Sequence, residues 1–277
     1  MAKGIGLIVN FKGKVGNMVG YHLSDSNTGN TQGIRVYQPI VKNPKTAAQA
    51  EQRAKLAPIN ATYRALKMII DRGNEGLPYG NKSRLAWLKI AFKATTMPWF
   101  EKGSTCNRPV ACQLTKGSLS GITFTAGEDV LQIAAGDVTS QTSVATIGAI
   151  STVLLAAYPA LKAGDQVTLV AVNAAGNDLS TDVFSFVIDT TSTVAAPRFS
   201  ASTGLIEYTV DGIVGAYSVI VSREGANGEH LRSTSVLKVN SEIAALAPYD
   251  ATSKAAAIES YQSSASANAD WAEESIH

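Results

Sequence analysis

The chain has 277 residues and a net charge of only +2, but that charge is divided unevenly along its length. Residues 1–116 carry 18 Lys and Arg against 5 Asp and Glu, and residues 117–277 carry 6 against 17, so the two parts have net charges of +13 and −11. A hydrophobic content of 45% is enough to bury a core. The only two cysteines, Cys106 and Cys112, exclude a disulfide framework. No apolar run is long enough for a membrane span.

The first forty residues indicate β-structure with many turns. Apolar runs at 5–11 and 34–41 enclose a glycine-rich stretch, and short apolar runs separated by glycines are typical of hairpins. Lys12-Gly13-Lys14 indicates a turn, and the polar segment 24–32 indicates a loop. We therefore expect a β-ribbon in this part of the chain, with its glycines at turns or bulges.

A helix start is predicted where the hydrophobic period changes after residue 42. Asn43 followed by Pro44 suits an N-cap and a first helical position. Thr46, with Gln49 three residues later, is an alternative start of the capping-box type. Both interpretations place the beginning of the first helix within the same few residues.

Two helices are predicted between residues 45 and 94. Helix-forming residues run from Lys45 to Asp71, with Gly73 as a stop. Pro58 lies inside this run and is expected to kink or divide the helix, because it lacks an N–H group and clashes with the preceding turn. A second helix is expected over 81–94. Its apolar stripe consists of Leu85, Leu88 and Phe92.

The helical region 42–93 is strongly basic and contains interleaved aromatic residues. Lys and Arg can neutralise phosphates or meet acidic protein surfaces, and aromatic rings can stack on bases. The same charges are also compatible with an ordinary solvated surface. The candidate contact residues, for protein or nucleic acid, are Lys45, Arg53, Lys55, Arg64, Lys67, Arg84, Lys89 and Lys93.

From about residue 105 the pattern changes to short strands at close spacing, with turn signals between many of them, which is typical of β-sandwiches. The fold class expected is α+β, mainly β: an N-terminal β-ribbon plus helices, then antiparallel Ig-like β-sandwich modules and a C-terminal helical tail. The predicted strands are 110–114, 121–125, 130–134, 144–150, 167–172, 183–188, 205–210, 217–221 and 231–239.

Four regions are expected from these patterns. Residues 1–104 form a basic β/helical domain, and residues 105–190 form a β-sandwich domain. The segment 190–196 (TTSTVAA) before Pro197 is interpreted as a linker, so residues 191–243 form a second small β module, whose independence is left open. Residues 244–277 form a helical and polar tail that contains Trp271.

The sequence contains no pattern that indicates catalysis. His22, His230 and His277 are far apart and form no metal-binding spacing with cysteines. The segment 117–121 (GSLSG) has Leu where a nucleophile elbow requires Ser. The glycines of 13–20 lack the spacing of a phosphate loop. We therefore expect a non-enzymatic protein with no catalytic residue, no cofactor and no metal.

Two segments resemble a family of uncharacterised proteins found in Bacteroidota and in their phages and mobile elements. Residues 12–21 (KGKVGNMVGY) are similar to its G-K-x-G-x-x-V-G-Y motif, and residues 41–55 (VKNPKTAAQAEQRAK) to its N-P-x-T-x-A-Q-x-x-Q-R motif at a helix start. Later segments, at 114–119, 164–172 and 219–235, also resemble that family. The resemblance implies no activity and transfers no catalytic residues, but it favours a phage or mobile-element product.

These observations predict a structural or assembly protein, a phage virion component, with itself or other virion proteins as partners. Its basic face would meet acidic β modules in multivalent contacts. The first alternative is a nucleic-acid-binding protein that uses the basic segment 42–93, and the second is a surface adhesin-like module. Residues 1–10 lack a signal-peptide cleavage site. We therefore expect a virion or host-cytoplasm location and no membrane partner.

Overall fold

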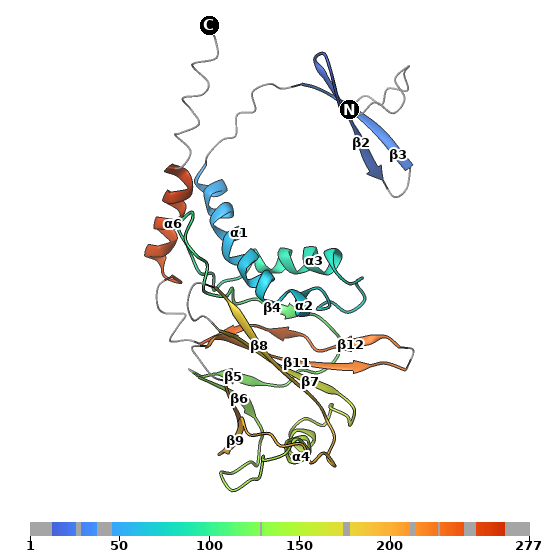
Figure 1. The fold of residues 1–277 in the computed structure, drawn as a ribbon, viewed down its shortest axis with the longest axis vertical. Coiled ribbons are helices and arrows are strands. Elements are labelled where there is room, and N and C mark those ends of the chain that lie inside the picture. The colour runs from blue at the N-terminus through green and yellow to red at the C-terminus, as the bar shows by residue number, and fades with distance from the viewer. Residues whose placement is uncertain are drawn as a thin grey trace. The chain divides into compact units, whose positions relative to one another are not determined.

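The computed structural model describes residues 13–25, 29–37, 46–127, 129–173, 178–210, 214–226, 228–240 and 248–263. Its contacts divide the chain into two compact units, residues 1–44 and residues 45–277 (Figure 1). The fold is mixed, with more strand than helix and several antiparallel sheets. Of the expected fold class, the mixture of helices with antiparallel sheets and the excess of strand over helix are therefore confirmed. In the described part of the chain, no helix is both long and apolar enough to cross a membrane.

The first unit contains a three-stranded antiparallel sheet in the order β1-β2-β3. Its strands are β1 (Gly13–Val15), β2 (Met18–Asp25) and β3 (Gly29–Val36). The turn lies at Gly16 and Asn17, where Gly16 adopts a φ of +57°, a conformation that glycine tolerates best. The turn predicted at 12–14 is wrong, because Gly13 and Lys14 pair with Gly20 and Val19 inside the ribbon.

Helix α1 (Ala47–Ala65) begins at Thr46, whose side-chain hydroxyl accepts a hydrogen bond from the Gln49 N–H at 3.4 Å. The structure therefore supports the Thr46 start, whereas Asn43 and Pro44 lie outside the described residues. Pro58 is buried inside α1, and the helix continues past it. The predicted run instead divides at Leu66, after which a short helix α2 (Lys67–Ile70) follows. Helix α3 (Asn81–Ala91) lies within the predicted 81–94.

Most of the remaining strands belong to two larger antiparallel sheets. One has the order β5-β6-β10-β9, and the other has the order β12-β11-β7-β8 with β14 also paired to β11. A short pair, β4 with β13, lies beside them. The strand bounds are β4 (Gln113–Thr115), β5 (Phe124–Ala126), β6 (Val130–Ala134), β7 (Gln166–Asn173), β8 (Ser180–Val187), β9 (Phe199–Ser202), β10 (Leu205–Thr209), β11 (Val214–Glu224), β12 (His230–Arg232), β13 (Ser235–Val236) and β14 (Lys238–Val239).

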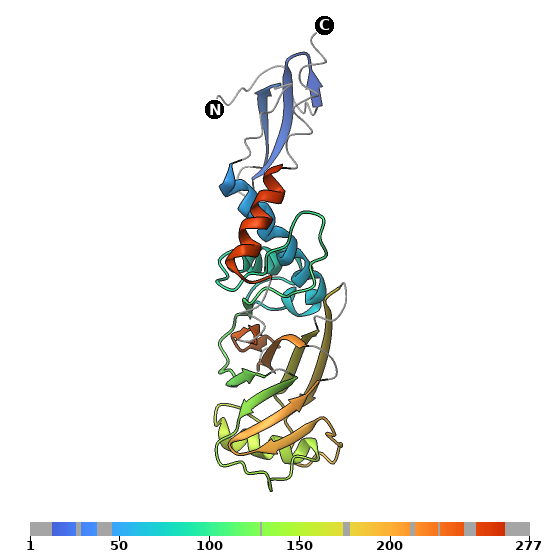
Figure 2. The ribbon, with the colours of Figure 1, turned by 90° about the vertical axis from the view of Figure 1, so that its left-hand side faces the viewer.

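Strands β7 and β11 are buried on both faces of their sheet. Side chains of a strand alternate between faces, so Val167 and Leu169 of β7 pack with Ile133 and Ile206 of the other sheet in one core. On the opposite face, β7 and β11 join a second core with the helices through Val170, Val172, Ala216 and Ile220. The helices α1 and α3 therefore lie on one side of this central sheet, and the β5-β6-β10-β9 sheet lies on its other side (Figures 1 and 2).

The strand predicted at 144–150 is wrong, because this segment opens helix α4 (Ile147–Ala157). Thr146 is its N-cap and accepts a hydrogen bond from the Ala149 N–H at 3.3 Å. A short apolar run does not distinguish a buried strand from a buried helix. Gly148 permits close packing here, since a Cβ at this position would lie 2.5 Å from the Ser192 carbonyl oxygen.

The segment 190–196, predicted as a linker, is fastened to the start of α4. The Ile147 N–H donates to Val194 O at 2.9 Å, and the Ala196 N–H donates to Ala145 O at 2.8 Å. Strands on either side of the expected boundary at residue 190 also pair directly, β7 with β11. The regions expected as 105–190 and 191–243 thus share one sheet and one compact unit.

Helix α6 (Ala251–Ser263) packs against α1. The Glu51 carboxylate of α1 accepts from Lys55 at 3.0 Å and from Lys254 of α6 at 3.2 Å. Ala257 of α6 is fully buried in the core shared with the helices. A helix was predicted in this region, but the tail beyond residue 263, including Trp271, lies outside the described residues.

Candidate functional site

The predicted basic residues divide into those engaged in packing and those facing solvent. Lys45 lies outside the described residues. Lys55 is paired with Glu51, and the Arg84 guanidinium lies 4.5 Å from the centre of the Tyr63 ring. Arg53 is half-buried. The exposed members of the set are Arg64 on α1, Lys67 on α2, Lys89 on α3 and Lys93 directly after α3.

Helix α3 presents a basic outer stripe. Its inner face buries Ser83, Trp87 and Ala91, so Lys82 and Lys89, seven residues apart, are exposed on its outer side together with Leu85, which is 51% exposed. Leu85 was predicted to belong to the apolar stripe and does not, whereas Leu88 and Phe92 pack partly against the core. The outer side of α3 thus offers a surface with positive charge and one apolar side chain.

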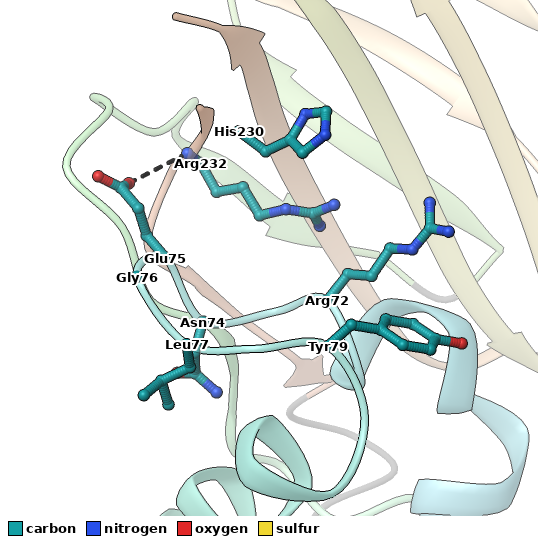
Figure 3. A pocket seen from close by; sticks show the side chains of 8 residues that line it. All are labelled: Arg72, Asn74, Glu75, Gly76, Leu77, Tyr79, His230 and Arg232. Atoms are coloured by element: carbon teal, nitrogen blue, oxygen red, sulfur yellow. Dashed lines mark hydrogen bonds between the residues drawn. The ribbon is translucent and has the colours of Figure 1, made fainter. Parts of the chain in front are cut away.

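A pocket with a volume of about 430 Å³ lies where the helical part meets strand β12 (Figure 3). Its polar side chains come from two distant parts of the chain. Arg72 follows α2, and Tyr79 precedes α3, whereas His230 and Arg232 belong to β12. On β12, His230 and Arg232 are alternate residues and therefore share one face of the sheet.

The Glu75 carboxylate holds these two parts together. It accepts hydrogen bonds from the Ser118 N–H at 2.9 Å, the Ser118 hydroxyl at 2.9 Å and the backbone N–H of Arg232 at 3.2 Å. The bonds from Ser118 contribute most to lowering the pKa of Glu75 below its usual value. A Cβ on Gly117 would lie 2.0 Å from the Arg232 carbonyl oxygen, so the close approach requires glycine. Glu75 therefore positions the backbone of Arg232.

The positive charges in the pocket are not neutralised by its carboxylate. In Figure 3 the guanidinium groups of Arg72 and Arg232 extend to the same side, away from the Glu75 carboxylate. Arg72 lies over the exposed Tyr79 ring, with 5.3 Å between the guanidinium carbon and the ring centre. Burial and the neighbouring Arg72 lower the pKa of Arg232. Across the described residues, neither arginine forms an ion pair.

This arrangement can bind an anion by charge and by hydrogen bonds. A guanidinium group carries five N–H donors, and a tyrosine hydroxyl or an imidazole can add further donors. The second acidic group nearby is Glu224, whose β11 position pairs with His230 and which therefore lies at the edge of the same face. Asn74 also lines the pocket, but its amide donates to Ser83.

This pocket was not predicted from the sequence. Arg72 was one member of a basic run, and Arg232 lies in the acidic part of the chain, so no local pattern connects them. The weak signal was compositional: Arg232 is one of only 6 basic residues in 117–277. An isolated cation in an acidic region is a reason to ask which distant group it meets.

Comparison with protein-family models, curated proteins and solved structures found no match for this chain. The pocket and the basic helices are therefore interpreted from their own geometry.

Proposed function

We propose that this chain is a non-enzymatic assembly protein, a component of a phage virion, whose basic helical part binds acidic protein surfaces. The supporting observation is the uneven pairing of charges. Arg64, Lys67, Lys89 and Lys93 are exposed, and none forms an ion pair within the described residues. The acidic residues in the second part of the chain supply surfaces of the complementary sign.

Exposed carboxylates on the sandwich offer such a surface. Asp129, Asp137 and Asp178 are exposed, and none forms an ion pair in the part of the chain that the structure describes. A contact between the helical part of one copy and the sandwich of the next would bring opposite charges together. Electrostatic complementarity of this kind sets the orientation and the rate of association more than the affinity.

We also infer that the two large sheets form one Ig-like sandwich, built from strands on both sides of the boundary expected at residue 190. Their strand orders, β5-β6-β10-β9 and β12-β11-β7-β8, correspond to the A-B-E-D and G-F-C orders of immunoglobulin domains with an added edge strand. Helix α4 would then occupy the connection between strands B and C. Sandwiches of this type serve many binding functions, so the inference agrees with a contact role and does not select its partner.

The virion assignment depends on the resemblance of residues 12–21 and 41–55 to proteins of Bacteroidota phages and mobile elements. The assembly role can be tested without that assignment. Light scattering coupled to size-exclusion chromatography would be run on the full chain at 50 and 500 mM salt. Since the contacts are charge-based, we expect a mass above that of the monomer at low salt and a lower mass at high salt.

A variant with Lys67, Lys89 and Lys93 changed to Gln should remain monomeric at low salt. The matched control changes the same three residues to Arg, which keeps the charge and should preserve assembly. A strict monomer at both salt concentrations would contradict self-assembly and leave only a contact with other virion proteins. Equal masses for the Gln and Arg variants would show that these charges do not mediate the contact.

Nucleic-acid binding is the second candidate, and Tyr79 favours it. Its ring is 60% exposed and lies beside Arg72 at the edge of the basic helices, where a base could stack. Titration of a labelled single-stranded oligonucleotide at several salt concentrations would test it. If phosphates are contacted, affinity falls steeply as salt rises. No binding at 50 mM salt would remove this candidate.

A further inference from the structure

Two guanidinium groups share one pocket without a counter-ion among the described residues. Arg232 is half-buried, and Arg72 is near enough to lower its pKa. Neither arginine forms an ion pair with any described residue. Bringing like charges together in a partly desolvated place is unfavourable, and an anion bound between them would relieve that repulsion.

The nearby carboxylates do not supply this anion. Glu75 is directed at Ser118 and at the Arg232 backbone, and its oxygens already accept bonds of 2.9–3.2 Å. In Figure 3 its carboxylate lies on the opposite side from the guanidinium groups. Glu224 lies at the edge of the same sheet face, opposite His230. The space between Arg72, Tyr79 and Arg232 is thus left for a ligand.

We propose that this pocket binds a phosphate monoester, held between the side chains of Arg72 and Arg232. A phosphate monoester carries close to two negative charges at neutral pH and three strong acceptor oxygens, which match two guanidinium groups. Each guanidinium can donate two parallel N–H bonds to such a group. His230 and Tyr79 line the same pocket and carry further N–H and O–H donors.

The size of the pocket indicates that the phosphate is part of a larger small molecule. Its volume of about 430 Å³ lies in the range of ligand sites, about 300–1,000 Å³. Leu77, which is 43% exposed, and the Tyr79 ring supply apolar surface for the remainder of such a ligand. The proposal does not depend on whether the chain assembles, because the pocket lies within one compact unit.

The pocket is also held in place before any ligand binds. Glu75 fixes the Arg232 backbone, and Gly117 allows the loop to approach β12 closely. The Tyr79 ring supports Arg72. Preorganisation of this kind lowers the entropy lost on binding.

Calorimetric titration of the full chain with inorganic phosphate and with glycerol phosphate tests the proposal, at constant ionic strength set by sodium chloride. We expect saturable binding with one site. Arg72→Gln and Arg232→Gln should each weaken it by about tenfold or more, because each variant removes charge-assisted hydrogen bonds to the phosphate. Lys102→Gln is the matched control, because it removes the same charge from an exposed site outside both the pocket and the basic helical face, and it should bind as the wild type does.

Three further probes make the assignment specific. Succinate tests for a carboxylate site, and dimethyl phosphate tests for the singly charged phosphodiester of nucleic acid. Both should bind at least tenfold more weakly than glycerol phosphate. Arg72→Lys keeps the charge but loses the planar pair of donors, and its affinity should lie between those of the wild type and Arg72→Gln. Thermal unfolding without ligand shows whether each variant is folded.

Absence of saturable phosphate binding would overturn the proposal. So would equal affinity for succinate or for dimethyl phosphate, or an equal loss of affinity in Lys102→Gln. If Arg232→Gln fails to fold, the two Arg72 variants still decide, because Arg72 is exposed and its replacement leaves the Glu75 contacts in place.

Discussion

Asp165 and Arg223 form a two-pronged ion pair that joins the turn before β7 to the far end of β11. Arg223 Nε lies 2.6 Å from Asp165 Oδ1, and Arg223 Nη2 lies 2.7 Å from Oδ2. The carboxylate also accepts from the Lys162 N–H at 2.8 Å, and only 1% of the Asp165 side chain is exposed. The pair therefore fixes a loop to the central sheet in a place that water scarcely reaches.

Replacing Asp165 by Asn should destabilise the protein by about 2–4 kcal/mol, because it leaves the Arg223 charge without its partner in a mostly buried place. Urea unfolding followed by circular dichroism would measure the change in the free energy of unfolding. The control is Asp182→Asn, which breaks the exposed pair with Arg198 and should cost less than about 1 kcal/mol. Equal losses in both variants would show that burial of the Asp165 pair does not matter.

Acid should unfold the protein partly through carboxylates that are hydrogen-bonded in the folded state. Burial raises the pKa of Asp165, but the bonds from Arg223 and Lys162 outweigh burial, and the net direction is downward. The pKa of Glu75 is lowered by Ser118. A lowered folded-state pKa gives stability that is present above the unfolded value of about 4 and is lost as pH falls through the folded value.

Urea midpoints measured between pH 7 and pH 2 would follow that loss. We expect little change down to about pH 5 and a steep fall below about pH 4. The Asp165→Asn variant should lose less stability over the same interval than the wild type does. A parallel pH profile for the two proteins would contradict the assignment of this group.

Gly117→Ala should destabilise the fold and loosen the pocket. The new methyl group would lie 2.0 Å from the Arg232 carbonyl oxygen and 2.7 Å from a Glu75 carboxylate oxygen. Because the nearest atom belongs to the backbone, β12 must shift, at a cost of about 1–3 kcal/mol. Gly76→Ala is a useful comparison, since its Cβ meets nothing within 4 Å and only its φ of +77° is strained. A larger loss for Gly76→Ala would contradict the packing argument.

The two cysteines should react with thiol reagents at very different rates. Both are free, but Cys112 is buried and Cys106 is partly exposed. Burial raises the pKa of Cys112 to about 12, so hardly any reactive thiolate forms near neutral pH. Ellman's reagent at pH 8 should label one thiol in the folded protein and two in urea. Cys106→Ser should abolish the labelling of the folded protein, and rapid labelling of that variant would contradict the burial of Cys112.

The parts predicted well from sequence are those whose pattern is local. The strand at Val130–Ala134 was predicted with its observed bounds, because turn signals flank a short run with alternating apolar residues. Thr46 could be predicted as an N-cap because Gln49 follows three residues later, and the Gln49 N–H does bond to the Thr46 hydroxyl. Thr146 provides the same signal before α4, but the apolar run after it was interpreted as a strand because its composition suits either element.

The parts not predicted depend on contacts between distant segments. Strand β9 (Phe199–Ser202) follows the predicted linker and was not predicted. It is held by pairing with β10, where the ring centres of Phe199 and Tyr208 lie 5.0 Å apart. The pocket at Arg72 and Arg232 combines two distant segments, and Glu75 links them by accepting a hydrogen bond from the backbone N–H of Arg232. The composition predicted basic helices, but it could not predict which of their charged side chains pack against other residues.

Strands β7 and β11 contribute one face to each of two cores. The helices and the two sheets therefore cannot be separated in evolution without exposing one of these cores. Val170 and Leu169 are neighbours in sequence but serve different cores, so an insertion of one residue in β7 would exchange their roles and damage both cores at once. The two sheets without the helices would expose the buried side chains of Val170, Val172, Ala216 and Ile220. We therefore expect recombination to transfer residues 45–277 together. We also expect substitutions on the inner faces of the helices to be accompanied by compensating substitutions in β7 and β11.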